Sequence, residues 1–150
     1  MKMYLGSDHG GFELKEQLKA WLSAQGHTIE DCGAYAATPD DDFPQFAFAV
    51  AEKVAAEPEA RGLLLCRSAG GMVIAANKVP GIRAVAALNE AQVKQDREHD
   101  DINILSISGN WTTSEQAQHL IQLFLDTPYS QEERHQRRLN AITAYEQAQV

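Results

Sequence analysis

Cysteine, basic residues and long apolar runs are scarce in this sequence. Its 150 residues include two cysteines, Cys32 and Cys66, too few for a disulfide framework, so we expect reduced thiols and a cytoplasmic protein. No apolar run approaches the roughly 20 residues of a membrane-spanning helix, and the first residues show no signal-peptide pattern. Because 13 Lys and Arg face 21 Asp and Glu, the formal charge is −8, which argues against non-specific nucleic-acid binding. We therefore expect neither a membrane nor a nucleic acid as a partner.

Metal-binding motifs and repeats are missing as well. There is no HExxH motif, no paired CxxC and no set of carboxylates with the spacing of metal ligands, so the sequence predicts no metal site and no cofactor. Internal repeats, linkers and low-complexity segments are also absent, and a chain of this length is long enough to bury a core. We expect a single domain over residues 1–150.

Strand and helix patterns alternate along the chain. In the first helix, Leu14, Leu18 and Leu22 recur on one face of a 3.6-residue period. The alternation predicts an α/β protein: a three-layer, Rossmann-like α/β/α sandwich with a parallel sheet of about five strands. No strand follows the last helix, so we expect it to pack on a partner subunit. The expected strands are 3–7, 28–32, 62–65, 83–87 and 103–107. The helices are expected to end near residues 26, 56, 78, 99, 128 and 147. Capping boxes at 112–115 and 130–133 are expected to begin the last two helices.

The stretch 63–78 contains the strongest candidate for chemistry. Its apolar run 63–65 is typical of a strand buried on both faces. Cys66 ends this run, and small residues then lead into a helix, which is where parallel sheets bind anionic ligands. A strand end, the adjacent Arg67 and a helix N-terminus all lower a thiol pKa, so we predict a reactive Cys66 facing an anionic small molecule. The alternative is a small buried hydrophobe, which is our interpretation of Cys32.

The loop from Arg67 to Gly71 is a candidate anion-binding site. Its small residues allow backbone N–H groups to approach an oxyanion, although tight turns between a strand and a helix use the same residues. Ser68 either donates its hydroxyl to that oxyanion or caps the following helix. The sequence leaves both roles open.

Two pairs of residues that contain histidine are further candidates. Asp8-His9 follows the first strand, so in a parallel sheet it lies at the same edge as Cys66; the alternative is an exposed Asx turn. His99-Asp100 ends the helix before the fifth strand. A histidine there either offsets the charge of the helix C-terminus or carries a proton near neutral pH.

A basic cluster, residues 134–138, is unusual in an acidic chain. Arg134 and Arg138 are four residues apart and share one face of a helix. Two arginines on one face suit bidentate binding of a phosphate. The alternative is a solvated surface.

Four segments complete a set of motifs that covers nearly the whole chain. They are Ser7-Asp8-His9-Gly10-Gly11-Phe12, the run Cys66 to Lys78 with Ala75-Ala76-Asn77-Lys78, the segment Glu98-His99 to Asn103, and Arg134-His135-Gln136-Arg137-Arg138. In kind and order they resemble the ribose-5-phosphate isomerase B family, which includes the galactose-6-phosphate isomerase subunits. The resemblance implies a metal-independent aldose–ketose isomerase of carbohydrate metabolism, acting on a sugar phosphate of the pentose phosphate pathway. It also implies a homodimer or homotetramer with active sites shared between subunits.

The resemblance further implies roles for individual residues. Cys66 is the expected base between C2 and C1, because Met72-Val73 stands where some members have a glutamate. His99 is expected to open the sugar ring and to lie across the site from the thiol. The other expected contacts are Ser68 with the loop residues Arg67, Ala69, Gly70 and Gly71 for the enediolate, Asp8 and His9 for the sugar, and Arg134 and Arg138 for the phosphate.

The chain departs from the family pattern at four positions of this expected site. Arg67 and Ala69 replace glycines, so a positive φ at either costs about 1 kcal/mol or more. Asp100 replaces an asparagine, and Asn110 replaces a phosphate-binding arginine whose charge Arg67 is not well placed to supply. We expect ribose 5-phosphate and ribulose 5-phosphate as the substrate pair. The alternatives are a hexose or tetrose phosphate, or a family member that binds a sugar phosphate without turning it over.

Overall fold

A parallel sheet of five strands forms the centre of the molecule, which is described over residues 1–150 by a computed structural model. The strand order is β2-β1-β3-β5-β4, with every neighbouring pair parallel. This confirms the predicted sheet, and each strand begins and ends within one residue of its predicted bounds. The strands are β1 (Lys2–Ser7), β2 (Thr28–Asp31), β3 (Arg61–Cys66), β4 (Ala84–Ala86) and β5 (Ile104–Ser108).

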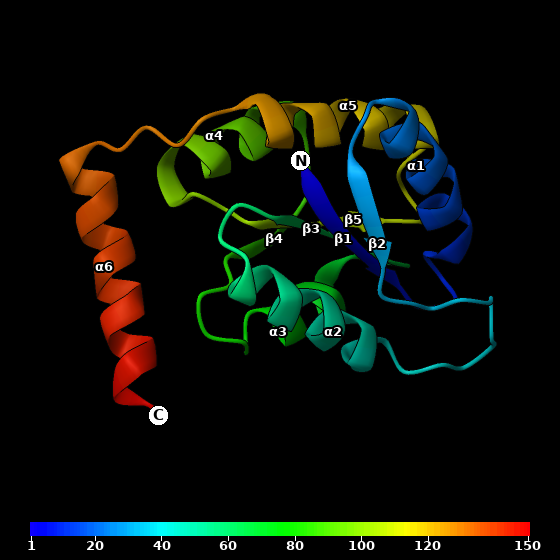
Figure 1. The fold of residues 1–150 in the computed structure, drawn as a ribbon, viewed down its shortest axis with the longest axis horizontal. Helices are drawn as coiled ribbons and strands as arrows, with labels where there is room; N and C mark the ends of the chain where they lie inside the picture. The colour runs from blue at the N-terminus through cyan, green and yellow to red at the C-terminus, as the bar shows by residue number, and fades with distance from the viewer.

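Helices cover both faces of the sheet, as the three-layer prediction requires. Figure 1 shows α1, α4 and α5 on one face and α2 and α3 on the other, while α6 stands beside the β4 end of the sheet. None of these helices has the length and apolar character needed to cross a bilayer. Their bounds are α1 (Phe12–Ala24), α2 (Phe43–Ala56), α3 (Gly70–Ala76), α4 (Glu90–Asp100), α5 (Ser114–Asp126) and α6 (Glu133–Ala148).

Two apolar cores lie between the sheet and its helix layers. Leu63 and Leu65 face the core beneath α1, α4 and α5, whereas Leu64 faces the core beneath α2 and α3, because side chains alternate along a strand. All three leucines are fully buried, and each stabilises the fold by about 2 kcal/mol relative to an exposed position. The predicted strand buried on both faces is therefore confirmed, and it holds Cys66 at a rigid strand end.

The starts of the last two helices differ from the predicted capping boxes. In α5 the N-cap is Thr113, whose hydroxyl accepts the N–H of Gln116, so the box lies one residue later than 112–115. The box predicted at 130–133 is wrong. Glu132 is the N-cap of α6 and makes no side-chain cap. The Ser130 hydroxyl accepts the N–H of Glu132 at 3.2 Å and lies 2.6 Å from Nδ1 of His135.

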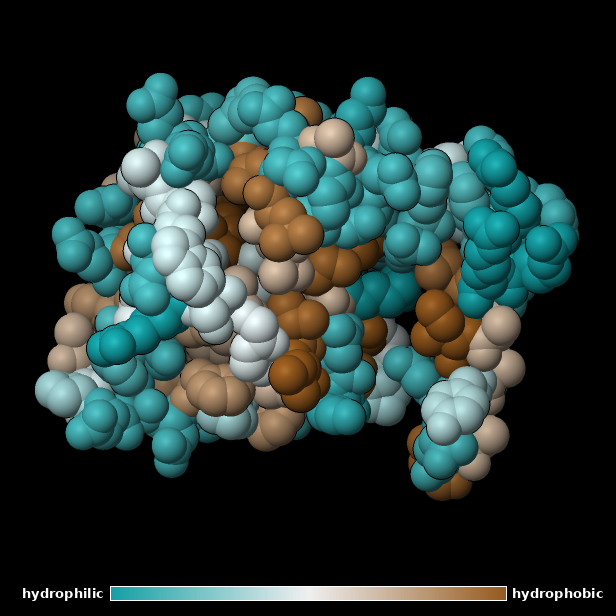
Figure 2. Space-filling view, turned by 180° about the vertical axis from the view of Figure 1, so that it is seen from behind, coloured by the Kyte–Doolittle hydropathy of each residue, from teal (hydrophilic) through white to brown (hydrophobic).

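Helix α6 extends away from the body of the molecule. Of its 16 residues, only His135 and Leu139 are buried. Ile142 and Tyr145, farther along the helix, are 50% and 70% exposed. Seen from behind in Figure 2, α6 forms a separate lobe with a recess between it and the body, and apolar side chains border that recess.

Candidate active site

Three strands end side by side at one edge of the sheet. The N–H of Asp8 donates to the carbonyl of Leu65 at 3.3 Å, and the N–H of Gly109 donates to the carbonyl of Cys66 at 2.7 Å. Gly109 lies so close to the first loop that an added Cβ would come within 2.5 Å of the Gly10 carbonyl oxygen. The loops after β1, β3 and β5 therefore converge at the carboxyl edge, as predicted for Asp8-His9 and the thiol.

Cys66 is 5% exposed and ends β3. Its Sγ accepts a hydrogen bond from the N–H of Ala69 at 3.1 Å. Burial raises the pKa of the Cys66 thiol, and the charge of Asp8 adds to this, while backbone N–H groups of the loop act in the opposite direction. The predicted lowering of this pKa is wrong, because the sequence shows the neighbouring Arg67 but not the depth of the thiol.

The loop after Cys66 has a fixed backbone. Ala69 has φ of 72° and is 2% exposed, so the expected strain exists at this position, whereas Arg67 has no positive φ. Ala69 is also the N-cap of α3, without a side-chain cap. The Ser68 side chain is exposed and its hydroxyl makes no hydrogen bond to the protein, which disfavours its capping role and leaves the hydroxyl free for a ligand.

The two glycines of this loop meet different neighbours. Gly70 begins α3 and is exposed. Gly71 lies beneath the Phe43 ring, and an added Cβ there would come within 2.7 Å of it. The start of α2 therefore covers part of the loop, and glycine at position 71 is what permits this approach.

Asp8 forms an Asx turn, which was the alternative to a functional role. Its Oδ1 accepts the N–H groups of Gly10 at 2.9 Å and Gly11 at 3.2 Å. Asp8 is 7% exposed, however, so this Asx turn is buried at the edge of the site. The turn fixes the backbone from which the His9 side chain projects.

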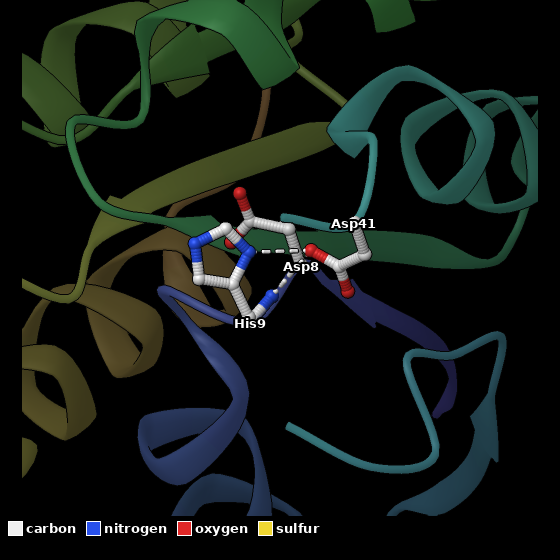
Figure 3. A group of neighbouring side chains, drawn as sticks. All are labelled: Asp8, His9 and Asp41. Carbon is white, nitrogen blue, oxygen red and sulfur yellow. Dashed lines mark hydrogen bonds and ion pairs between the residues drawn. The ribbon is translucent and has the colours of Figure 1, made fainter. Parts of the chain in front are cut away.

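His9 is bound by Asp41, a residue that the sequence did not single out. Figure 3 shows the Asp41 carboxylate facing the His9 ring; Oδ1 lies 2.5 Å from Nδ1 and 3.0 Å from the His9 backbone nitrogen. Asp41 stands between two other aspartates in a loop, so no spacing or periodicity distinguishes it. Ligand atoms of Asp8, His9 and Asp41 lie within 4.8 Å of one another. Within this group, one oxygen of each carboxylate already accepts hydrogen bonds from the protein.

His99 lies at a second place, where α4 meets α6. Its ring stacks on that of His135, with centroids 4.2 Å apart and an interplanar angle of 26°. Burial and the neighbouring charge of His99 hold the pKa of His135 below its ordinary value. Sequence reasoning missed His135 as a contact of His99. Its spacing of four residues from the buried Leu139 was an available signal.

The structure places His99 and Cys66 at opposite edges of the sheet. Strand β5 begins at Ile104, which pairs with Gly62, and ends at Ser108, which pairs with Cys66. The two ends of β5 are about 13 Å apart at a rise of about 3.3 Å per residue. His99 precedes the start of β5, because α4 runs back from the carboxyl edge. Within one chain, His99 is therefore not across from the thiol.

The candidate site residues accordingly form two groups, each with one member that the sequence did not predict: Asp41 in the first and His135 in the second. We call the first the carboxyl-edge group and the second the α4–α6 corner. The carboxyl-edge group comprises Asp8, His9, Asp41, Cys66 and Ser68; the α4–α6 corner comprises His99, Arg134, His135 and Arg138.

The arginines of the α4–α6 corner are exposed, and each immediately precedes a buried residue of α6, His135 or Leu139. Arg134 pairs with Glu132 at 2.8 Å, whereas Arg138 has no ion pair. Asp100 is also exposed, and its backbone carbonyl accepts a hydrogen bond from Arg83.

Arg67 and Asn110 are neighbours at the carboxyl edge. The Arg67 carbonyl accepts the N–H of Asn110 at 3.2 Å and also the hydroxyl of Ser108. The Arg67 side chain lies over Gly10 and is exposed, as is Asn110. Both residues are thus available to a ligand that occupies the carboxyl edge.

Comparison with known proteins identifies the family of this chain. The chain matches the family model Ribose/Galactose Isomerase over residues 3–142. It is 42% identical over 146 residues to ribose-5-phosphate isomerase B of Mycolicibacterium paratuberculosis, covering 97% of this chain and 92% of that protein. The solved ribose-5-phosphate isomerase B of Mycoplasma genitalium, with bound ribulose 5-phosphate, has a TM-score of 0.93 and 33% identity, covering 97% and 96% of the two chains. That of Clostridium thermocellum has a TM-score of 0.93 and 34% identity, with both chains fully covered. The chain therefore belongs to the ribose/galactose isomerase family, as a sugar-phosphate isomerase of the ribose-5-phosphate isomerase B type.

Proposed function

We propose that this chain interconverts ribose 5-phosphate and ribulose 5-phosphate through an enediolate. The observation that carries the proposal is the setting of Cys66, a buried thiol that accepts a backbone N–H at the end of a central strand. The choice of sugar is supported by relatives named ribose-5-phosphate isomerase B, one of which was solved with ribulose 5-phosphate.

The proposed reaction is a transfer of protons within the open-chain sugar. The Cys66 thiolate removes the proton from C2, and the electrons of that C–H bond form the C1–C2 double bond of the enediolate. The thiol then returns the proton to C1 while a proton moves from O2 to O1, which leaves a carbonyl at C2. Backbone N–H groups of the loop 67–71 and the Ser68 hydroxyl stabilise the negative oxygen, so the proposed step needs no metal ion.

The raised pKa of Cys66 shapes this step. Burial makes the thiolate the minority form at neutral pH, and it also makes that thiolate a stronger base once formed. The N–H of Ala69, 3.1 Å from Sγ, stabilises the thiolate without adding a mobile charge to the site. The proposal therefore predicts a rate that rises with pH.

The second half of each site comes, in this proposal, from another copy of the chain. One copy holds His99 and the phosphate-binding arginines at the edge opposite to its own thiol. In a dimer with two-fold symmetry, the α4–α6 corner of each copy can meet the carboxyl edge of the other, which gives two equivalent sites. The exposed Ile142 and Tyr145 of α6 and the recess in Figure 2 support contact with a second copy.

A sugar phosphate of different length is a second candidate substrate. Two observations favour it: Asn110 places no positive charge at the carboxyl edge, and the exposed Arg67 places one on the adjacent loop. A phosphate bound by Arg67 would lie nearer to Cys66 than one bound beyond Asn110. This arrangement suits a shorter chain, such as a tetrose phosphate.

A panel of aldose phosphates tests the function. The purified chain is incubated in D₂O with tetrose, pentose and hexose phosphates, and NMR follows both the ketose product and deuterium exchange at carbon. We expect product and exchange with ribose 5-phosphate, and neither with the matched variant Cys66→Ala. Product from a tetrose or hexose phosphate alone would select the second candidate. Binding of sugar phosphates without product or exchange would show a binding protein instead of an isomerase.

A further inference from the structure

One oxygen of Asp41 binds two groups of the same residue. Oδ1 accepts the backbone N–H of His9 at 3.0 Å and lies 2.5 Å from ring nitrogen Nδ1 (Figure 3). The Asp41 side chain is 9% exposed and that of His9 is 24% exposed. Two contacts from one fixed oxygen determine both where the imidazole lies and how it is rotated.

The Asp41 carboxylate has no other donor. Its second oxygen, Oδ2, is buried and receives no hydrogen bond from the protein. The lysine nearest in the sequence, Lys53, is paired with Glu30 at 2.6 Å, and Lys15 and Lys19 are paired with Asp31 at 2.7 and 2.5 Å. The charge of Asp41 is therefore directed at His9.

The segment that carries Asp41 is anchored at both ends. At its start, the fully buried Lys15 ammonium donates to Asp31 and to the carbonyl of Ala34. At its end α2 begins with Phe43, whose ring covers Gly71 of the Cys66 loop. Asp41 is thus held between two fixed points, next to the thiol loop.

The chemistry of the pair decides the state of the ring. An ionised carboxylate only accepts hydrogen bonds, so Nδ1 must carry the proton, and the lone pair of a neutral imidazole then lies on Nε2. Nε2 makes no hydrogen bond within the protein. We propose that Asp41 is a positioning residue that holds His9 in the Nδ1–H tautomer and so presents Nε2 as an acceptor to a hydroxyl of the sugar. This assignment of the acceptor to a sugar hydroxyl rests on the proposed function.

The two neighbouring aspartates provide a matched control. Asp40 is exposed, and its side chain forms no hydrogen bond. Asp40→Asn therefore removes the same charge from the same loop without touching His9, and asparagine tolerates the positive φ of 60° at this position. Asp41→Ala removes the acceptor, and Asp41→Asn keeps an acceptor oxygen without the charge.

NMR of the His9 ring nitrogens tests the positioning directly. In the wild type at alkaline pH, we expect a protonated Nδ1 and an unprotonated Nε2. In Asp41→Ala we expect the proton to move mainly to Nε2, the preferred tautomer of imidazole in water. Asp41→Asn should lie between the two, and Asp40→Asn should match the wild type. An unchanged tautomer in Asp41→Ala, or an equal change in Asp40→Asn, would overturn the proposal.

Substrate titration and kinetics test the sugar contact. Ribose 5-phosphate should shift the Nε2 resonance of the wild type, and Asp41→Ala should raise KM about 10-fold with kcat nearly unchanged, because a bond made in ground and transition state alike is lost. The thermal unfolding midpoint should match that of Asp40→Asn. A wild type without isomerase activity would end the proposed function, while the tautomer and the Nε2 shift would still decide the role of Asp41. Loss of activity on chelation, restored by added Zn²⁺, would instead make Asp8, His9 and Asp41 a metal site and overturn this proposal.

Discussion

The carboxyl-edge group and the α4–α6 corner are held in place by different means. Cys66 and Asp8 are buried at the ends of central strands, and backbone hydrogen bonds join their loops. In the α4–α6 corner, Arg134 and Arg138 are exposed on a helix that buries only two of its residues. A group fixed by backbone is ready in one copy of the chain, whereas exposed side chains on a projecting helix need a partner surface to be ordered.

Removing the base should have the largest effect and tests the carboxyl-edge group. We expect Cys66→Ala to lower kcat by at least about 100-fold, since general base catalysis contributes about 10² to 10⁴. The fold should remain, because Ala fills most of the buried position. The isomerase assay with ribose 5-phosphate measures this, and circular dichroism checks the fold. Activity close to wild type would exclude Cys66 as the base.

Mixing two inactive variants tests whether the two groups come from different copies. Cys66→Ala and His99→Asn, each expected to be inactive alone, are coexpressed with different affinity tags. In randomly mixed dimers we expect about a quarter of wild-type activity, because half the dimers are mixed and each mixed dimer has one intact site. A mixture that contains both tags but remains inactive would contradict a shared site.

The pH dependence of the rate tests how the burial of Cys66 affects catalysis at the carboxyl edge. Burial raises the pKa of Cys66 above its ordinary value, and the base acts as the thiolate. From pH 7 to 8.5 we therefore expect kcat/KM to rise by about 10-fold per unit, as the thiolate fraction does below the pKa of a thiol. A profile that is flat over this range would show a base with a lower pKa.

Acidification should affect the α4–α6 corner. Burial and His99 hold the pKa of His135 below its ordinary value, so the unfolded chain binds this proton more tightly than the folded one. Stability contributed by neutral His135 is present above about pH 6.5 and is lost as the pH falls through the lower folded value. Between pH 7.5 and 5.5, the unfolding midpoint should fall further for the wild type than for His135→Gln. Equal losses would show that this histidine does not sense acid.

The smallest expected effect concerns the strained residue in the thiol loop. Ala69→Gly relieves a positive φ, worth about 1–2 kcal/mol, against a glycine entropy cost of about 0.5–1 kcal/mol. We expect the free energy of unfolding in urea to rise by about 0.5 kcal/mol. The control Ala75→Gly, inside α3, should lower it by about 1 kcal/mol. A loss of stability in Ala69→Gly would mean that packing around the Ala69 methyl outweighs the backbone strain.

Much of the fold could be predicted because it depends on local patterns. The apolar run 63–65 and the helical spacing of Leu14, Leu18 and Leu22 are visible in the sequence, and both occur as expected. The predicted cap of α5 was one residue too early, because Thr112 and Thr113 are adjacent and chemically alike. The capping box predicted for α6 is wrong because the helix begins after Glu132, two residues later than Ser130 as N-cap requires, and the Ser130 hydroxyl contacts the N–H of Glu132 and the ring of His135.

The candidate site was predicted only in part. The convergence of Asp8, His9 and Cys66 follows from strand direction alone, since carboxyl ends of parallel strands share one edge. Asp41 was not predictable, because three consecutive aspartates are equivalent until the loop folds against His9. The position of His99 follows from the direction in which α4 returns across the sheet, and its stacking on His135 depends on α6.

The sequence by itself determined the family, the order of strands and helices along the chain, and a thiol at the end of a buried strand. These features are encoded by neighbouring residues or by motifs whose spacing is fixed. The tertiary structure decided how acidic that thiol is, which aspartate holds His9, and that one chain separates Cys66 from His99. Burial, loop contacts and the edge of a sheet are properties of residues distant in sequence, so they appear only once the chain has folded.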